Sequence, residues 1–286
     1  MKLQQNIRII VSALFFLLAS SLTHAKEPKF YVISPKISKE LTDFYFNHGF
    51  KPRRSIPSNL SPQDNIIFYD CQISNELEHL QILYVCHQPN ESDITTSAFL
   101  IPVPSPVDQL TLAQTVMAQD LNIAVFYSRN SELQYKYLAT NKAEGVKLSG
   151  YRSYGSLKFD KDIKEIIKDN DAVLALTDNS IFNTATLRAI MLSTYREHKP
   201  IFGPNKAFVQ AGSIASLHVT DINIAETAIE LSNQFQNDEY LPGIYFTKTQ
   251  QYETNPTAAR TLSLDLPLRS EISSTVTRKE AKDVHL

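Results

Sequence analysis

Short apolar runs alternate with amphipathic stretches between Ile123 and Phe235, and this alternation constrains the fold more than any single motif. Three of the runs read as buried strands, because they are short, apolar and bounded by polar residues: Ile123–Tyr127, Ala172–Leu176 and Ile214–Val219. Between them, apolar residues recur at the three- and four-residue spacing of one helix face. Strands that alternate with helices in this way predict parallel sheets built from right-handed β-α-β units, so we expect an α/β fold.

The chain divides at a proline-rich segment, Pro102–Pro106, which cannot be helical and reads as a crossing between two lobes. Before it we expect a helix over 34–50, a loop over 51–64, and strands at Phe30–Ile33, Ile66–Tyr69, Gln81–Val85 and Ala98–Ile101. These patterns predict a first lobe over residues 26–104, completed by residues of about 243–268, and a second α/β lobe over 105–242. Two lobes, each with its own core, suit a chain of 286 residues.

The first 25 residues have the pattern of a secretory signal peptide. Two cations precede an apolar run, Ile9–Ala19, that is short for a membrane span, and Thr23-His24-Ala25 supplies the small residues that a signal peptidase reads. We expect cleavage after Ala25 and a periplasmic mature protein; the alternative is an anchor that stays attached to the membrane. At the other end, residues 269–286 are charged and poor in large apolar groups, which predicts a disordered tail.

Charge and cysteine content narrow the classes of partner. The chain has 28 basic and 30 acidic residues, and this balance argues against nucleic acid or an anionic membrane as the main partner. Cys71 and Cys86 are the two cysteines; in an oxidising compartment they predict a disulfide, and the alternative is two buried thiols on neighbouring strands. His79 and His87 lack a zinc-ligand spacing, and the Gly-x-Gly-x-x-Gly fingerprint of dinucleotide cofactors is missing. We therefore expect no metal and no cofactor.

Part of the chain resembles a known family. Thr177-Asp178-Asn179 after a strand, then Lys199–Gly203 and Ala207–Ser213, are similar to the second lobe of bacterial ABC-transporter substrate-binding proteins. These have the type I periplasmic-binding-protein fold, and the branch in question includes tryptophan and tyrosine binders. Asn255–Arg260 resembles the closing segment of that branch, and Ser105-Pro106-Val107 resembles its lobe crossing. The resemblance covers roughly residues 105–267 and implies two lobes of parallel sheet flanked by helices, with a first lobe shorter than the family normally has.

Ligands of open parallel sheets bind beyond the carboxyl ends of the strands, and this rule nominates ten residues. Helix N-termini after Ser128 and Asn179 offer backbone N–H groups that suit a carboxylate, Arg129 could add a bidentate contact, and Asp178 could meet an amino group. The full set is Ser34 from the first lobe, and Ser128, Arg129, Asn130, Ser131, Thr177, Asp178, Asn179, Gly203 and Pro204 from the second. Each of these residue types also serves as an ordinary cap, turn residue or solvated charge in loops.

The resemblance implies a periplasmic solute-binding protein of an ABC-type uptake system, whose lobes close on an amino acid or a similar small molecule. An ABC permease or another envelope membrane protein would read the closed form. We expect a monomer, and no enzyme, because no nucleophile elbow or nucleophile–base pair stands out. The alternative, motivated by the shortened first lobe, is a relative that has lost transport and serves as a sensory or assembly partner of an envelope protein.

Overall fold

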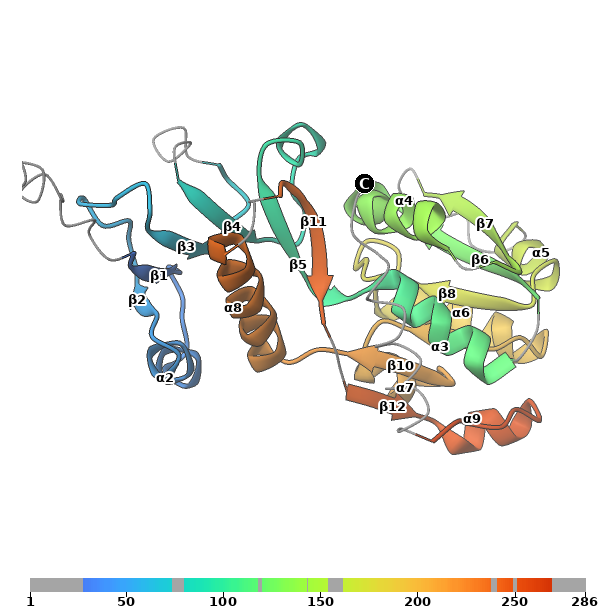
Figure 1. Ribbon diagram of the computed structural model, residues 1–286. Helices are drawn as coiled ribbons and strands as arrows, with labels where there is room; N and C mark the ends of the chain where they lie inside the picture. Colours follow the sequence, from blue (N-terminus) through green and yellow to red (C-terminus); the bar gives the residue numbers. More distant parts are fainter. Residues whose placement is uncertain are drawn as a thin grey trace, which may run out of the picture.

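Two six-stranded sheets, each flanked by helices, form two lobes that lie side by side (Figure 1). The computed structural model describes residues 28–73, 80–117, 120–142, 144–153, 162–237, 241–248 and 251–268. The expected signal peptide and C-terminal tail lie outside these ranges. The expected α/β class with predominantly parallel sheets is confirmed.

The first lobe contains a sheet with the strand order β2-β1-β3-β4-β5-β11, in which all paired neighbours are parallel. Its strands are β1 (Phe30–Ile33), β2 (Lys51–Arg53), β3 (Asn65–Phe68), β4 (Gln81–Val85), β5 (Ala98–Pro104) and β11 (Gly243–Thr247). Two helices, α2 (Lys39–Asn47) and α8 (Asp221–Asn237), pack on one face of this sheet. Helix α2 begins after Ser38, whose Oγ accepts a hydrogen bond from the backbone N–H of Leu41 at 3.2 Å.

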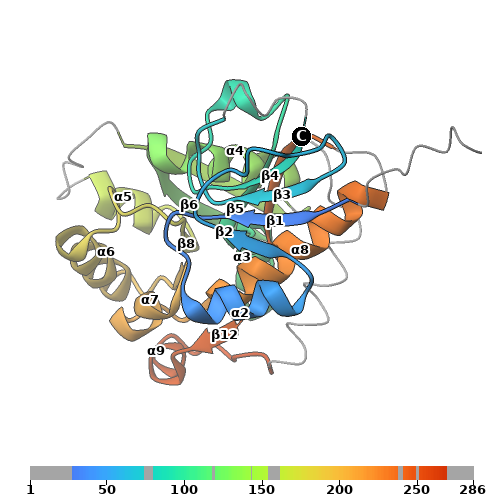
Figure 2. The same ribbon diagram turned by 90° about the vertical axis from the view of Figure 1, so that its left-hand side faces the viewer.

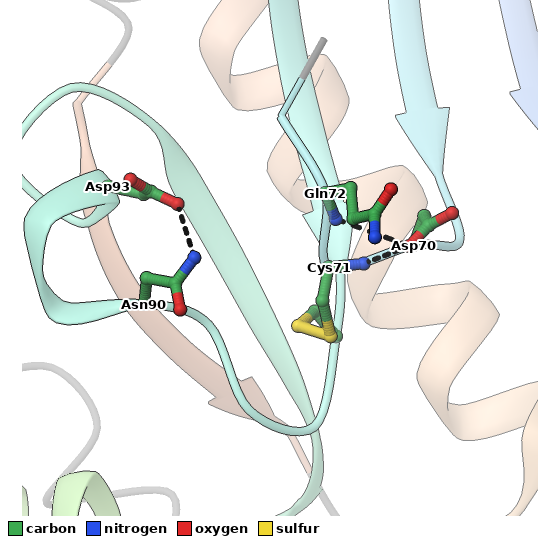
Figure 3. Close-up of a disulfide and its surroundings, with 6 residues drawn as sticks. Asp70, Cys71, Gln72, Asn90 and Asp93 are labelled. Atoms are coloured by element: carbon green, nitrogen blue, oxygen red, sulfur yellow. Dashed lines mark hydrogen bonds between the residues drawn. A yellow bond between two sulfur atoms is a disulfide. The ribbon is translucent and has the colours of Figure 1, made fainter.

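Successive strand residues point to opposite faces of the first sheet and so divide its core into two layers. Val32 and Ile67 pack against the helices, whereas Ile66 lies in a second cluster formed with residues of the connecting loops. Among the described residues of the β2–β3 and β4–β5 connections, the helical structure is limited to the 3-10 turn η2 (Glu91–Asp93). The loop-covered face also carries the Cys71–Cys86 disulfide, which joins segments beyond β3 and at the end of β4, with Cα atoms 5.0 Å apart (Figure 3). The predicted disulfide is thus confirmed.

The second lobe repeats the same strand order, β7-β6-β8-β9-β10-β12, with β12 antiparallel to β10. Its strands are β6 (Leu121–Tyr127), β7 (Val146–Arg152), β8 (Ala172–Ala175), β9 (Ile201–Gly203), β10 (Ala215–His218) and β12 (Gln251–Thr254). Its helices are α3 (Pro106–Met117), the 3-10 turn η3 (Arg129–Ser131), α4 (Glu132–Asn141), α5 (Asp162–Lys168), α6 (Thr184–Arg196), α7 (Lys206–Ala211) and α9 (Pro256–Thr261). In both sheets the strand order reverses next to the first strand of the lobe, which creates a switch point there.

The chain crosses between the lobes after β5, between β10 and α8, and between β11 and β12. The structure therefore corrects the expected division at two places. The helix over 221–237 was expected in the second lobe, but its residues Ala225, Ala228 and Leu231 pack in the core of the first sheet. Residues 251–261 were expected to complete the first lobe, but β12 pairs with β10 and Ala259 of α9 packs in the core of the second lobe.

Four strands were not expected from the sequence: β2, β7, β11 and β12, each at an edge of its sheet. β2 lies within the expected loop 51–64. In β7, exposed residues interrupt the buried and partly buried ones. Edge strands need not have the continuous apolar pattern of the central strands. Pro106, expected outside any helix, is the first residue of α3, where its missing N–H leaves no intrahelical bond unmade.

Candidate functional site

A cavity of about 250 Å³ lies between the two lobes. The first lobe contributes the segment that follows β4, one residue of β5 and one of β11, and the second lobe contributes η3 and the first turn of α4. The lining residues are His87, Gln88, Pro89, Asn90, Glu91, Ile101, Arg129, Asn130, Glu132, Leu133, Gln134 and Phe246. Small-molecule sites commonly measure about 300–1,000 Å³, so this cavity suits a small ligand.

Arg129 gives the cavity its distinctive charge. It is exposed and lines the cavity together with Asn130. Among the residues that the structure describes, no carboxylate forms an ion pair with Arg129, whereas Glu132 and Glu91 are paired with other cations. Partial desolvation by the neighbouring atoms lowers the pKa of His87. The guanidinium is thus available for an anionic group of a ligand.

Directly behind Arg129, a buried carboxylate fixes the turn that presents it. Oδ2 of Asp178 accepts hydrogen bonds from Ser128 N at 3.2 Å, Ser128 Oγ at 2.6 Å and Ser131 Oγ at 2.6 Å. Oδ1 accepts from Ser180 N at 2.9 Å and Ser180 Oγ at 2.5 Å. Burial raises the pKa of Asp178, but the hydrogen bonds from the three serines together outweigh it, and the pKa lies below the usual range of a carboxyl.

Helix α4 forms the contact between the lobes beside the cavity. Lys136 Nζ forms an ion pair with Glu91 of the first lobe and lies 3.9 Å from Glu132 Oε1. The ring of Tyr137 on the same helix lies 4.6 Å from the ring of Phe246 in β11. Closing or opening of the lobes would make or break these contacts, because they join α4 to elements of the other lobe.

The ten residues nominated from the sequence fall into three groups. Arg129 and Asn130 line the cavity. Ser128, Ser131 and Asp178 form the hydrogen-bonded cluster behind it, and Thr177 N donates to Oε1 of Gln134, a cavity residue, at 3.2 Å. The remaining four lie outside the residues that line this cavity: Ser34, Asn179, Gly203 and Pro204.

Two of the remaining residues have a clear structural role. Ser34 N donates to Arg53 O at 3.0 Å and so extends the pairing of β1 with β2. A Cβ on Gly203 would lie 2.3 Å from Cβ of Phe208, so glycine permits the close approach of α7 to β9. The sequence suggested that Asp178 could accept a hydrogen bond from an amino group of a ligand. In the structure its carboxylate oxygens already accept five hydrogen bonds from serine residues.

The first-lobe wall of the cavity, His87–Glu91, was not nominated from the sequence. It follows β4 directly, so the rule that ligands bind beyond the carboxyl ends of strands would have found it had the rule been applied to this predicted strand as well. Phe246 could not have been found in this way, because its strand, β11, joins the first sheet from a distant part of the sequence.

No family model matches the chain, and no curated protein is detectably similar to it. Among solved structures, the ABC domain from Streptococcus pneumoniae in complex with L-Trp aligns at 13% identity over 87% of this chain and 98% of its own, with a TM-score of 0.51. A substrate-binding protein with adhesive properties from Clostridium difficile, in a ligand-free, open form, aligns at 13% identity over 84% of this chain and 97% of its own, with a TM-score of 0.54.

The chain has the fold of a type I periplasmic binding protein. This fold agrees with the resemblance seen in the sequence. By their descriptions, the first neighbour is an ABC domain in complex with L-Trp and the second is a substrate-binding protein, and the alignment spans nearly the whole of each. Within the described ranges, no helix combines the length and the apolar composition that a bilayer crossing requires.

Proposed function

We propose that the protein is a solute-binding protein of the periplasm that closes its two lobes on a small molecule in the cavity beside α4. The observation that carries this proposal is a cavity between the lobes whose walls come from both sheets and which contains a cation, Arg129, without an ion-pair partner among the described residues. A ligand that contacts both walls stabilises the closed form over the open form by its differential affinity.

The chemistry of the cavity favours a ligand with an anionic group and further hydrogen-bonding groups. Arg129 suits a carboxylate or a similar planar anion, and Asn130, Gln88 and Asn90 supply carboxamides that donate and accept. Ile101 and Phe246 add apolar surface on the first-lobe side. An amino acid or a related small zwitterion meets these requirements, and an ABC permease would be the membrane partner that reads the closed form.

The test is a thermal-shift screen of the protein against amino acids and related carboxylates. A ligand that binds the native state raises the unfolding midpoint in proportion to the logarithm of its concentration. For such a ligand, Arg129→Gln should weaken binding roughly 10- to 100-fold, because a hydrogen-bonded charge contact is worth about 1.5–3 kcal/mol. The matched control is Arg188→Gln, which removes an exposed cation of α6 that does not line the cavity.

Equal affinity of the Arg129→Gln and Arg188→Gln variants would refute the proposed site, even if a ligand were found. Absence of any thermal shift across the panel would refute small-molecule binding of this class. That second outcome would favour a transport-inactive relative that acts as a sensory or assembly partner of an envelope protein. The loop-covered face of the first sheet, where the described β2–β3 and β4–β5 connections contain no α-helix, motivates this second candidate.

A further inference from the structure

The first β-α-β unit of the chain carries a concentration of positive charge on a protein of negative net charge. Residues 28–56 contain six Lys and Arg side chains against two carboxylates, whereas the whole chain has a formal net charge of −2. Five of the six cations are exposed: Lys36, Lys39, Lys51, Arg53 and Arg54. None of the five forms an ion pair with another residue that the structure describes.

Three of these cations surround one hollow of about 510 Å³ between α2 and β2. Lys39 lines it from the first turn of α2, and Arg53 and Arg54 line it from the end of β2. The hollow also contains Thr42. Lys39, Thr42 and Phe46 lie on one face of α2 at helical spacing, and the exposed carboxylate of Asp43 lies on the same face. The basic groups therefore share one surface, which we call the basic pole, with an aromatic side chain.

Two large apolar side chains are exposed at or beside the basic pole. Phe46 is 70% exposed and Ile56, two residues after Arg54, is 38% exposed. Proline and charged residues on an edge strand prevent it from pairing with a strand of another chain, and this explains Pro52 and Arg53 on β2. It does not explain Lys39 on the helix or an exposed Phe46 beside it. Cations together with exposed aromatic and aliphatic groups are the combination that binds interfaces of anionic lipid.

The position of the basic pole leaves the cavity free. Figure 1 shows β2 and α2 at the end of the first lobe that lies farthest from the second sheet, and Figure 2 shows the two elements next to each other on that side. β1 pairs with β2. The first described strand of the chain thus lies at this end of the fold.

From charge, exposed apolar groups and position together, we infer that the basic pole docks on an anionic phospholipid surface, with Lys39, Arg53 and Arg54 meeting phosphate groups and Phe46 entering the headgroup region. This docking holds the protein at the membrane while the cavity between the lobes stays accessible. It is independent of the proposed ligand, because none of the basic-pole residues lines the cavity.

The test is co-sedimentation of the expected mature chain, residues 26–286, with two kinds of vesicle, phosphatidylcholine alone and phosphatidylcholine with phosphatidylglycerol at roughly a third of the lipid. The expected result is binding to the anionic vesicles that is weakened by added salt. The triple variant Lys39→Gln/Arg53→Gln/Arg54→Gln should lower the partition coefficient about 100-fold, since each basic residue near the surface contributes about fivefold. Phe46→Ser should lower it several-fold without changing the preference for anionic lipid.

The matched control is Lys147→Gln/Arg188→Gln/Arg196→Gln, which removes three exposed cations of the second lobe and changes the net charge equally. It should bind anionic vesicles within about threefold of the wild type, because its charges lie on the other lobe. All variants should unfold at the wild-type midpoint, since the substituted side chains are exposed. Equal binding of the wild type to both vesicle types would overturn the inference, and so would an equal loss in the control variant, which would indicate an effect of net charge alone.

Discussion

Substitution of Asp178 by alanine tests how the second lobe presents Arg129 to the cavity. The carboxylate is 3% exposed and accepts five hydrogen bonds from Ser128, Ser131 and Ser180. These bonds join the carboxyl ends of β6 and β8 at the switch point of the sheet. Alanine removes every acceptor at once and leaves buried donors without their partner.

The loss in the free energy of unfolding depends on whether the serine donors find other acceptors in the variant. The hydroxyls of Ser128 and Ser180 already lie 3.0 Å apart and can bond to each other, and Ser128 N still reaches Ser131 Oγ at 3.1 Å. Adding the contributions of all five charge-assisted hydrogen bonds would therefore overestimate the loss in the free energy of unfolding. We expect Asp178→Ala to lower the free energy of unfolding by about 3–4 kcal/mol, since a buried donor without a partner costs about 1–3 kcal/mol.

Asp178→Asn separates the charge of this residue from its shape. One amide oxygen can still accept the bonds that Oδ2 accepts from Ser128 and Ser131, but the amide nitrogen then faces the N–H of Ser180. We expect about half of the loss seen with alanine. Urea unfolding at neutral pH measures the free energy of unfolding of both variants, and the loss should be larger for Asp178→Ala than for Asp178→Asn.

Unfolding measurements at acidic pH can refute this reasoning. Since the pKa of Asp178 is lower in the folded protein than in the unfolded chain, the carboxylate stabilises the fold above the unfolded pKa of about 4, and this contribution is lost as the pH falls through the folded value. The difference between the wild type and Asp178→Ala should therefore narrow below about pH 4. A loss below about 1 kcal/mol at neutral pH, or a difference that stays constant in acid, would show that the cluster does not stabilise this turn.

Two further substitutions test the packing of the lobes. Gly203→Ala should lower the free energy of unfolding by about 1–3 kcal/mol, because the new Cβ would lie 2.3 Å from Cβ of Phe208; an unchanged urea midpoint would mean that α7 shifts without cost. Replacing Cys71 and Cys86 together by alanine should lower it by about 3 kcal/mol, as estimated for closing a loop of this length. Reductant should destabilise the wild type to the same extent and leave the double variant unaffected.

Local pattern was sufficient for the central strands and for the helices beside them. Ile123–Tyr127 and Ala172–Leu176 were predicted within a few residues of β6 and β8, because buried parallel strands are continuous apolar runs with clear polar boundaries. Four edge strands, β2, β7, β11 and β12, were missed because an edge strand has one side open and needs no such run. The lining of the cavity followed the same division: Arg129 was nominated because it closely follows a predicted strand, whereas Phe246 was not nominated.

The sequence by itself determined that this chain forms parallel α/β sheets, that two cysteines could pair, and that polar residues such as Arg129 follow the strands. Tertiary structure decided which sheet each late element joins, so that α8 and β11 complete the first lobe while β12 and α9 complete the second. The reason is that helix and strand periodicity depends on near neighbours, whereas the partner of an element is selected by burial against residues far away in the chain. The cavity depends on that selection, because its two walls belong to different lobes.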